Sequence, residues 1–494
     1  MIKRISAAIL ITIMLFTTVG AVLLSAEAAG QTLTAEGIDA YIAAQMEKGH
    51  IPGLALGVVK GDSVVYLKSY GEAAPGRAVS ENTPFALGSV SKMFTSLAIR
   101  QLISEGKLKE REAIRDYLPE FKPTYEGREA EITVFDLLAH TSGIPAASGG
   151  APYLYNPRYT MSELVKKAAH TRLNRPVDSS YEYSNLNYLL LGLIIERVTH
   201  QPYRDYIQVH ILDRLGMTHT YLKEQDAEKA GLAEGHSILL GVSHTVRYPI
   251  PQGFLPTGGV LSSTGDMTRF LRCFLNEGYY EGRSVIPDNP LPLPQGAEAA
   301  PNEKLWYNIF WLVNSGDENT NLRHEGSLPN YASSLRVNRQ ARYGIVVLAN
   351  SFDQTAFYSP SITPWSISEG VMSYLETGSF PQQVPVRGSY GRLLPWLFPL
   401  ALLVLYAVYT IRRVRRSFKV RVISLPVDFA LPLLWVLLVP SINDSSWAWL
   451  LASNPEQNNL LLGLMALLPV VGIIKTVVYV RRNSPNRRVS TPKP

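Results

Sequence analysis

The chain has 494 residues, enough for one large domain with additional segments, and a formal net charge of +6. Residues 412–494 hold 12 Lys and Arg against 3 Asp and Glu, so the remainder is close to neutral or mildly acidic. This distribution argues against a nucleic-acid partner. A single cysteine, Cys273, excludes an intrachain disulfide. The histidines show no familiar metal-binding spacing, and we predict neither a metal nor another cofactor.

Residues 1–29 resemble a secretory signal peptide. Lys3 and Arg4 precede the apolar residues 9–24, and Ala26-Glu27-Ala28 is typical of a cleavage site. Because the apolar run is nearly long enough to span a bilayer, an uncleaved anchor remains open. In either case we expect the residues that follow to lie outside the cytoplasm.

The next segment, residues 30–380, has the pattern of one folded domain. A helix is expected over 33–48, followed by a β-hairpin formed by 54–60 and 63–70. Residues 113–300 are expected to be mostly helical, most clearly at 188–198.

Strands return near the end of this domain, at 309–313, 333–337 and 344–349, before a last helix at 365–375. Strands at both ends of the domain with helices between them predict an α+β fold, in which one sheet flanked by helices lies beside a helical lobe. A Pro-containing linker is expected over 381–392.

Three apolar runs follow the linker, at 393–411, 422–442 and 460–480, and each has about the 20 residues that a bilayer core requires. Arg and Lys lie between the first two runs and in the tail 481–494, but not between the second and third. The positive-inside rule therefore predicts three transmembrane helices within 393–480, an extracytoplasmic domain and a basic cytoplasmic tail. Such a cell-membrane protein also leaves room for a membrane-protein partner.

Two charged residues lie inside the predicted membrane helices. Asp428 and Lys475 should lie at similar depth, each several residues from the cytoplasmic end of its helix. Because an unpaired charge there is unfavourable, we hypothesise that the two residues pair. The alternative, in which Lys475 extends toward the cytoplasm and Asp428 contacts water, remains open.

The candidate nucleophile is Ser89. It lies three residues before Lys92, at the start of the strongly apolar segment 93–103. Positions i and i+3 share one face of a helix, and a buried lysine that loses its proton can activate a serine. The same spacing occurs at Ser104 and Lys107, which we interpret as a solvated helix end, so the pattern alone is weak.

Further motifs follow in a fixed order along the chain. They are Leu137–Pro145 (LLAHTSGIP), Tyr183-Ser184-Asn185, Gly258–Met267 and His324-Glu325-Gly326. Together with Ser89 and Lys92, this order resembles the serine β-lactamase and penicillin-binding protein superfamily, closest to its class C β-lactamase, D-aminopeptidase and esterase branch. The resemblance covers about residues 34–377 and implies an antiparallel sheet.

The resemblance also implies roles for individual residues. Ser89 would form an acyl-enzyme, and Lys92 and Tyr183 would share its deprotonation, with the choice of base left open. Tyr183 would also protonate the leaving group, and Asn185 would bind a substrate amide. The backbone N–H groups of Ser89 and Ser327 would form the oxyanion hole.

His324 and Gly326, which would bind substrate, belong to a triad that begins with lysine in many relatives. Histidine is largely neutral at pH 7, so efficient β-lactam hydrolysis is less expected than for a lysine-containing triad. Turn or structural roles are the alternatives for Tyr183, Asn185 and His324, and for His140 we favour the structural role.

We therefore expect a membrane-anchored, extracytoplasmic serine hydrolase that acts on D-amino-acid-containing peptides from peptidoglycan or secreted peptides. One alternative is a prodrug-activating peptidase or an esterase. The layout resembles inner-membrane prodrug peptidases, but Ala86 and Asn185 differ from the residues found in that subgroup. Another alternative is a non-catalytic sensor of wall peptides.

Overall fold

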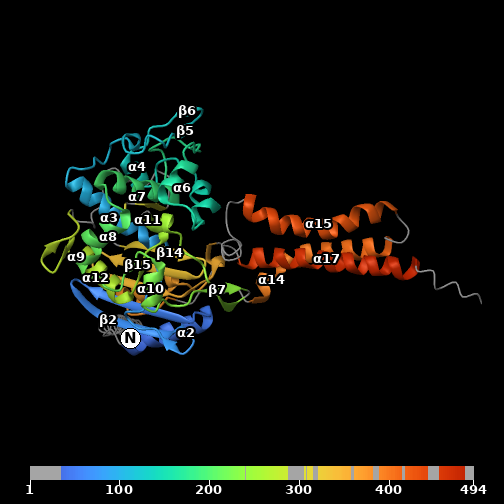
Figure 1. The fold of residues 1–494 in the computed structure, drawn as a ribbon. Coiled ribbons are helices and arrows are strands. Elements are labelled where there is room, and N and C mark those ends of the chain that lie inside the picture. Colours follow the sequence, from blue (N-terminus) through green and yellow to red (C-terminus); the bar gives the residue numbers. More distant parts are fainter. Residues whose placement is uncertain are drawn as a thin grey trace, which may run out of the picture.

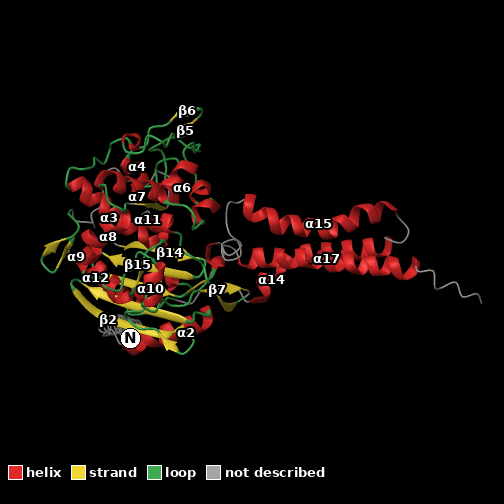
Figure 2. Cartoon of the chain, in the orientation of Figure 1, coloured by secondary structure: helices red, strands yellow, loops and turns green. Residues whose placement is uncertain are grey.

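The computed structural model describes residues 35–239, 241–287, 305–307, 309–314, 321–357, 361–381, 389–413, 418–442 and 455–483. The predicted signal segment 1–29 and most of the tail 481–494 lie outside these residues. So do most of the predicted linker and most of the loop between the last two apolar runs. Figures 1 and 2 show an α+β domain from whose side the long helices α14 (Ser389–Arg413), α15 (Phe418–Ile442) and α17 (Pro455–Asn483) extend.

The centre of the domain is an eight-stranded antiparallel sheet, with order β12-β13-β14-β15-β16-β1-β2-β3. The strands are β1 (Gly53–Lys60), β2 (Ser63–Ala74), β3 (Arg77–Ala78), β12 (Leu305–Tyr307), β13 (Leu312–Asn314), β14 (Asn321–Leu328), β15 (Tyr331–Asn338) and β16 (Tyr343–Ala349). Leu54 of β1 faces Tyr70 on one side and Ala349 on the other. The predicted sheet formed from both ends of the domain is therefore present.

The two faces of the sheet contribute to different parts of the core. Alternate residues of β1 point to opposite faces, as in any strand. Leu54 and Leu56 pack with α2 (Ala35–Gly49) and α13 (Pro364–Thr377), whereas Ala55 and Val59 belong to the larger core on the opposite face. That second face carries α12 (Thr264–Leu275) and the helical lobe (Figure 1).

The helical lobe is formed by the middle of the chain. Its main helices are α3 (Ser91–Ser104), α4 (Val134–Leu138), α6 (Met161–Lys167), α7 (Asn185–Thr199) and α11 (Leu255–Gly258), with shorter helices α5 (Ala146–Gly149), α8 (Tyr203–Ile207), α9 (Asp213–Leu215) and α10 (Glu224–Lys229). Most residues of α3 are buried, as its apolar sequence predicts, and α7 extends the predicted helix 188–198 at its N-terminal end.

Several short strands differ from the predicted pattern. The region expected to be mostly helical contains the pairs β5 (Thr124–Tyr125) with β6 (Arg128–Glu129), β7 (His236–Leu239) with β8 (Val242–Thr245), and β10 (Tyr279–Tyr280) with β11 (Arg283–Ser284). It also contains β9 (Leu261–Ser262), and β9 and β7 pair with strands from outside this region, β4 (Phe85–Ala86) and β17 (Ser351–Phe352) respectively. The predicted strand 309–313 is β13 at 312–314. The sequence analysis also missed strand β14, because its alternating polar residues Arg323, Glu325 and Ser327 resemble a loop.

The C-terminal part consists of α14 (Ser389–Arg413), α15 (Phe418–Ile442) and α17 (Pro455–Asn483), so helix begins inside the predicted linker. Among the described residues, one segment, Leu461–Val480 of α17, is long and apolar enough to cross a membrane. In α15 the apolar segment is shorter, Pro426–Leu438. Three separate membrane spans are thus not confirmed, because the other two helices do not meet the same criterion.

The hypothesis that Asp428 and Lys475 pair agrees with the structure. Lys475 Nζ lies 2.6 Å from Asp428 Oδ2, and both side chains are fully buried. Tyr406 of α14 donates its hydroxyl to Asp428 Oδ1 over 2.8 Å, and its ring lies 4.6 Å from Lys475 Nζ. One residue from each helix therefore contributes to the same polar cluster.

Candidate active site

Ser89 lies in a short 3-10 turn, Gly88–Val90, that leads directly into α3. Gly88 has a φ of +54°, which favours glycine, and a Cβ at this position would lie 2.5 Å from the backbone nitrogen of Ser327. Strand β14 therefore passes directly against the turn that carries Ser89. The same close contact requires glycine at position 326, since a Cβ there would lie 2.0 Å from the carbonyl oxygen of Leu87.

Lys92 lies one helical turn after Ser89, as the spacing predicts, and its side chain is fully buried. Its Nζ is 3.3 Å from Ser89 Oγ and 2.8 Å from both Asn185 Oδ1 and the carbonyl oxygen of Thr257. All these partners are uncharged. Burial without a counter-charge lowers the pKa of Lys92 well below its usual value.

Tyr183, in the segment just before α7, also contacts Ser89. Its hydroxyl donates a hydrogen bond to Ser89 Oγ over 2.8 Å, and Lys92 Nζ lies 4.9 Å from the centre of its ring. Burial raises the pKa of Tyr183 well above its usual value, so the phenol keeps its proton at neutral pH. Lys92 and Tyr183 thus both contact Ser89 Oγ, although Tyr183 lies 94 residues after Ser89 in the sequence.

Asn185 is the first residue of α7 and connects the lysine to the outer part of the site. Its Oδ1 accepts from Lys92, and its Nδ2 donates to the Tyr155 hydroxyl over 3.1 Å. Ser89, Tyr183 and Asn185 are each partly exposed, whereas Lys92 is not. Solvent therefore reaches Ser89, Tyr183 and Asn185 but not Lys92.

The structure places His324 differently from an exposed substrate-binding cation. Its side chain is buried, and its Nε2 lies 2.8 Å from the Tyr307 hydroxyl. Burial lowers the pKa of His324 to about 3, so the ring is neutral at physiological pH. Within the described contacts, His324 makes no hydrogen bond to Ser89, Lys92 or Tyr183, whereas its neighbours Gly326 and Ser327 adjoin the Ser89 turn.

Three residues of this network were missed in the sequence analysis. Thr257 immediately precedes the recognised segment 258–267, so its position could have drawn attention to it. Tyr155 and Tyr307 lie in irregular or short elements, η3 (Pro152–Tyr155) and β12, where no local pattern marks a functional residue. Among the described residues, no group of three or more His, Cys, Asp or Glu side chains is arranged to hold a metal ion.

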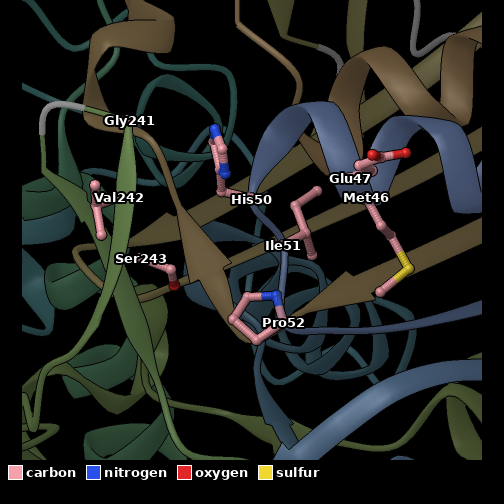
Figure 3. Close-up of a pocket in the computed structure, with 8 residues that line it drawn as sticks. All are labelled: Met46, Glu47, His50, Ile51, Pro52, Gly241, Val242 and Ser243. Carbon is pink, nitrogen blue, oxygen red and sulfur yellow. The ribbon is translucent and has the colours of Figure 1, made fainter. Parts of the chain in front are cut away.

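A separate open pocket of about 430 Å³ lies between the end of α2 and the β7–β8 hairpin (Figure 3). Its lining residues are Met46, Glu47, His50, Ile51, Pro52, Gly241, Val242 and Ser243. None of them belongs to the Ser89 network. The two sites are therefore distinct.

A serine at the start of a buried helix, contacted by a lysine one turn later and by a tyrosine from a second segment, defines a class of serine hydrolases. The comparison with family models agrees, since residues 38–360 match the Beta-lactamase family. Because this match covers more than half of the sequence, the chain belongs to that family. Its fold is that of β-lactamases and penicillin-binding proteins.

Two curated proteins illustrate the similarity. Protein flp of Staphylococcus aureus strain MW2 is 34% identical over 318 residues, which cover 63% of this chain and 62% of flp. The chain thus spans less than two thirds of the length of flp. A provisionally assigned D-alanyl-D-alanine carboxypeptidase of Escherichia coli K12 is 29% identical over 318 residues, or 56% of this chain and 71% of that protein.

Solved structures show the same fold. The octameric penicillin-binding protein homologue of Pyrococcus abyssi has a TM-score of 0.62 at 24% identity, over 71% of this chain and 79% of its own. FmtA from Staphylococcus aureus has a TM-score of 0.56 at 21% identity, over 71% of this chain and 92% of FmtA. A class C β-lactamase has a TM-score of 0.54 at 21% identity, over 69% of this chain and 96% of the enzyme.

Proposed function

We propose that this chain is a membrane-anchored serine hydrolase that acts through an acyl-enzyme, with D-amino-acid-containing peptides as its substrates. The observation that carries the proposal is the convergence of Lys92 and Tyr183 on Ser89 Oγ, at 3.3 and 2.8 Å. A serine hydroxyl is a weak nucleophile until a nearby base accepts its proton. Both neighbours are placed for proton transfer.

Lys92 is the better candidate for the base. A neutral amine has two N–H bonds and one lone pair, and two of the three partners of Lys92 Nζ, Asn185 Oδ1 and the Thr257 carbonyl, can only accept. The lone pair is then left for the proton of Ser89. Tyr183, whose pKa is raised by burial, remains protonated and acts as a donor.

The reaction follows from these assignments. Lys92 takes the Ser89 proton while Oγ forms a bond to the substrate carbonyl carbon, and the carbonyl electrons move to its oxygen, near the backbone N–H groups of Ser89 and Ser327. The carbonyl then re-forms and the bond to the leaving nitrogen breaks, while Tyr183 gives that nitrogen a proton. The proton held by Lys92 restores the phenol. Water releases the acyl group by the reverse sequence and returns the proton to Ser89.

The electrostatics of the site bear on the substrate. Burial lowers the pKa of Lys92 and that of His324, the latter to about 3, so burial opposes a permanent cation for a substrate carboxylate at either position. This observation favours substrates without a carboxylate next to the scissile bond. An esterase or a prodrug-activating peptidase is therefore the second candidate, whereas the carboxypeptidase-like activity suggested by the relative from Escherichia coli would act next to such a carboxylate.

The membrane anchor is part of the proposal. Most large apolar side chains exposed in the described structure lie on α14, α15 and α17, and their polar cluster Tyr406, Asp428 and Lys475 lies between the helices. An apolar exterior around a polar interior fits lipid better than water. We propose that all three helices span the membrane, with the domain outside and the C-terminus in the cytoplasm.

The test is the intact mass of the full chain in detergent after treatment with a fluorophosphonate, which reacts with activated serines. Wild type should gain one adduct, and Ser89→Ala should gain none. Ser104→Ala is the matched control, since Ser104 has the same spacing to a lysine but is exposed. Equal labelling of wild type and Ser89→Ala would exclude Ser89 as the nucleophile. A parallel incubation with benzylpenicillin and with D-alanine p-nitroanilide would then separate the substrate classes.

A further inference from the structure

We propose that His140 is a positioning residue for Tyr183, an inference that rests on the proposed function. His140 lies in the loop after α4 and is fully buried, so it does not meet the substrate itself. It contacts Tyr183 and both of its chain neighbours, through its backbone, its ring nitrogen and its ring face. Two of these contacts hold the backbone beside the tyrosine, and the third is with the tyrosine ring.

The first two contacts hold the chain on both sides of Tyr183. The backbone N–H of Glu182 donates to the His140 carbonyl oxygen over 2.8 Å. The backbone N–H of Ser184 donates to His140 Nδ1 over 3.2 Å. One residue thus accepts hydrogen bonds from the residues immediately before and after the tyrosine, which restrains the peptide unit that follows Tyr183 and the one that precedes Glu182.

The third contact is with the ring. The centres of the His140 and Tyr183 rings are 4.5 Å apart, and the ring planes are tilted by 33°. This packing limits rotation of the phenol, whose hydroxyl must point at Ser89 Oγ to make the 2.8 Å hydrogen bond. The imidazole ring therefore packs against the phenol ring and restricts its orientation.

His140 is itself held in one orientation and one protonation state. Asn187 Nδ2 lies 2.8 Å from the same Nδ1, and Ser142 donates its hydroxyl to Asn187 Oδ1 over 2.8 Å. Two N–H donors at Nδ1 require this nitrogen to accept, so the neutral ring carries its proton on Nε2. Burial lowers the pKa of His140 well below its usual value and so keeps the ring neutral.

The backbone of the loop is fixed as well. His140 has a φ of +57°, in the left-handed region, and the next residue, Thr141, donates its N–H to the carbonyl oxygen of Asp136 over 2.9 Å. The Thr141 hydroxyl donates to the Asp136 carboxylate over 3.2 Å. A strained residue held by surrounding hydrogen bonds often marks a functional site.

The experiment compares two esters of butyric acid, using the full chain in detergent. Ethoxide is a poor leaving group and needs a proton from Tyr183, whereas p-nitrophenoxide leaves without one. We expect His140→Ala to lose about 100-fold in kcat/KM for ethyl butyrate and less than about 5-fold for p-nitrophenyl butyrate, the same pattern as Tyr183→Phe. Combining the two changes should cost no more than Tyr183→Phe alone, because both remove the same proton transfer.

Two further variants keep the test decisive. His140→Asn retains an acceptor near the position of Nδ1 and tolerates a positive φ, so it should keep ethyl butyrate hydrolysis within about 5-fold of wild type. If His140→Ala does not fold, His140→Gly takes its place, because glycine adopts this conformation without strain. Equal losses on both esters, or losses that multiply with Tyr183→Phe, would overturn the positioning role. Ester hydrolysis that survives Ser89→Ala would instead overturn the proposed function.

Discussion

Lys92 of the catalytic domain and Lys475 of the C-terminal helices are both completely buried, but their surroundings differ. Lys475 lies 2.6 Å from the carboxylate of Asp428, and Tyr406 contributes a third group. Lys92 is held by neutral partners, the side chain of Asn185 and the carbonyl of Thr257. One lysine has a counter-charge from another helix, and the other has only hydrogen-bond acceptors.

This difference separates two uses of a buried amine. A counter-charge stabilises the ammonium form, which then joins two helices but has no lone pair for chemistry. Neutral acceptors hold the amine in place without stabilising its charge, so burial lowers the pKa of Lys92 and makes it a base. Substitution by methionine should therefore mainly reduce activity at Lys92 and mainly reduce stability at Lys475.

The largest expected effect is the loss of activity in Lys92→Met. Removal of the base should reduce kcat/KM for p-nitrophenyl butyrate by about 10³–10⁴-fold. The free energy of unfolding should change by no more than about 2 kcal/mol, because relief from burying an amine offsets the loss of its three hydrogen bonds. Lys107→Met, at an exposed lysine, is the control and should leave both quantities unchanged. Retention of activity in Lys92→Met would exclude this lysine as the base.

Next in size is the destabilisation caused by Lys475→Met. Asp428 would remain buried without its partner, which should lower the free energy of unfolding of the helices by about 3–5 kcal/mol. Unfolding by SDS, monitored by circular dichroism, measures this change. Ile474→Met, at the neighbouring exposed position, should be close to neutral.

Restoring the balance of the pair refines this second prediction. Asp428→Leu combined with Lys475→Met should recover most of the lost stability, because no charge is left unpaired. The charge swap Asp428→Lys, Lys475→Asp should also be more stable than Asp428→Lys alone. If Asp428→Lys alone is as stable as the swap, the pair does not contribute to assembly of the helices.

A smaller effect is expected from giving Lys92 the counter-charge that Lys475 already has. In Asn185→Asp, a carboxylate would lie near Lys92 Nζ and raise the pKa of the lysine. Activity that needs the neutral amine is lost as pH falls through this pKa, so the acid limb of kcat/KM should move to higher pH by about 1–3 units. Gln201→Glu introduces the same charge at an exposed site and should leave the limb in place. An unshifted limb in Asn185→Asp would mean that another group titrates.

The smallest effect concerns His324. Because burial lowers its pKa to about 3, this ring is already neutral throughout pH 5–9. His324→Gln should therefore leave the shape of the pH–rate profile unchanged in that range, while loss of the hydrogen bond to Tyr307 should reduce stability by about 1 kcal/mol. Disappearance of the acid limb in this variant would show that His324, not Lys92, controls it.

Much of the site was predictable because its motifs are local. The spacing of Ser89 and Lys92 places them on one helix face whatever the rest of the chain does. Tyr183 and Asn185 were found by their resemblance to a family motif, not by any periodicity. Strand β14 was missed because Arg323, Glu325 and Ser327 lie on a less buried face of the sheet, so half of the strand appears polar.

The sequence by itself determined the order of the motifs, the buried helix after Ser89, the two-ended sheet and the apolar helices, because each depends on spacing over a few residues or turns. Only the tertiary structure decided which groups surround the two buried lysines. Thr257 and Asn185 reach Lys92 from segments far along the chain, and Asp428 reaches Lys475 from another helix. The protonation state of a buried group depends on such long-range packing, since burial and nearby charges set its pKa.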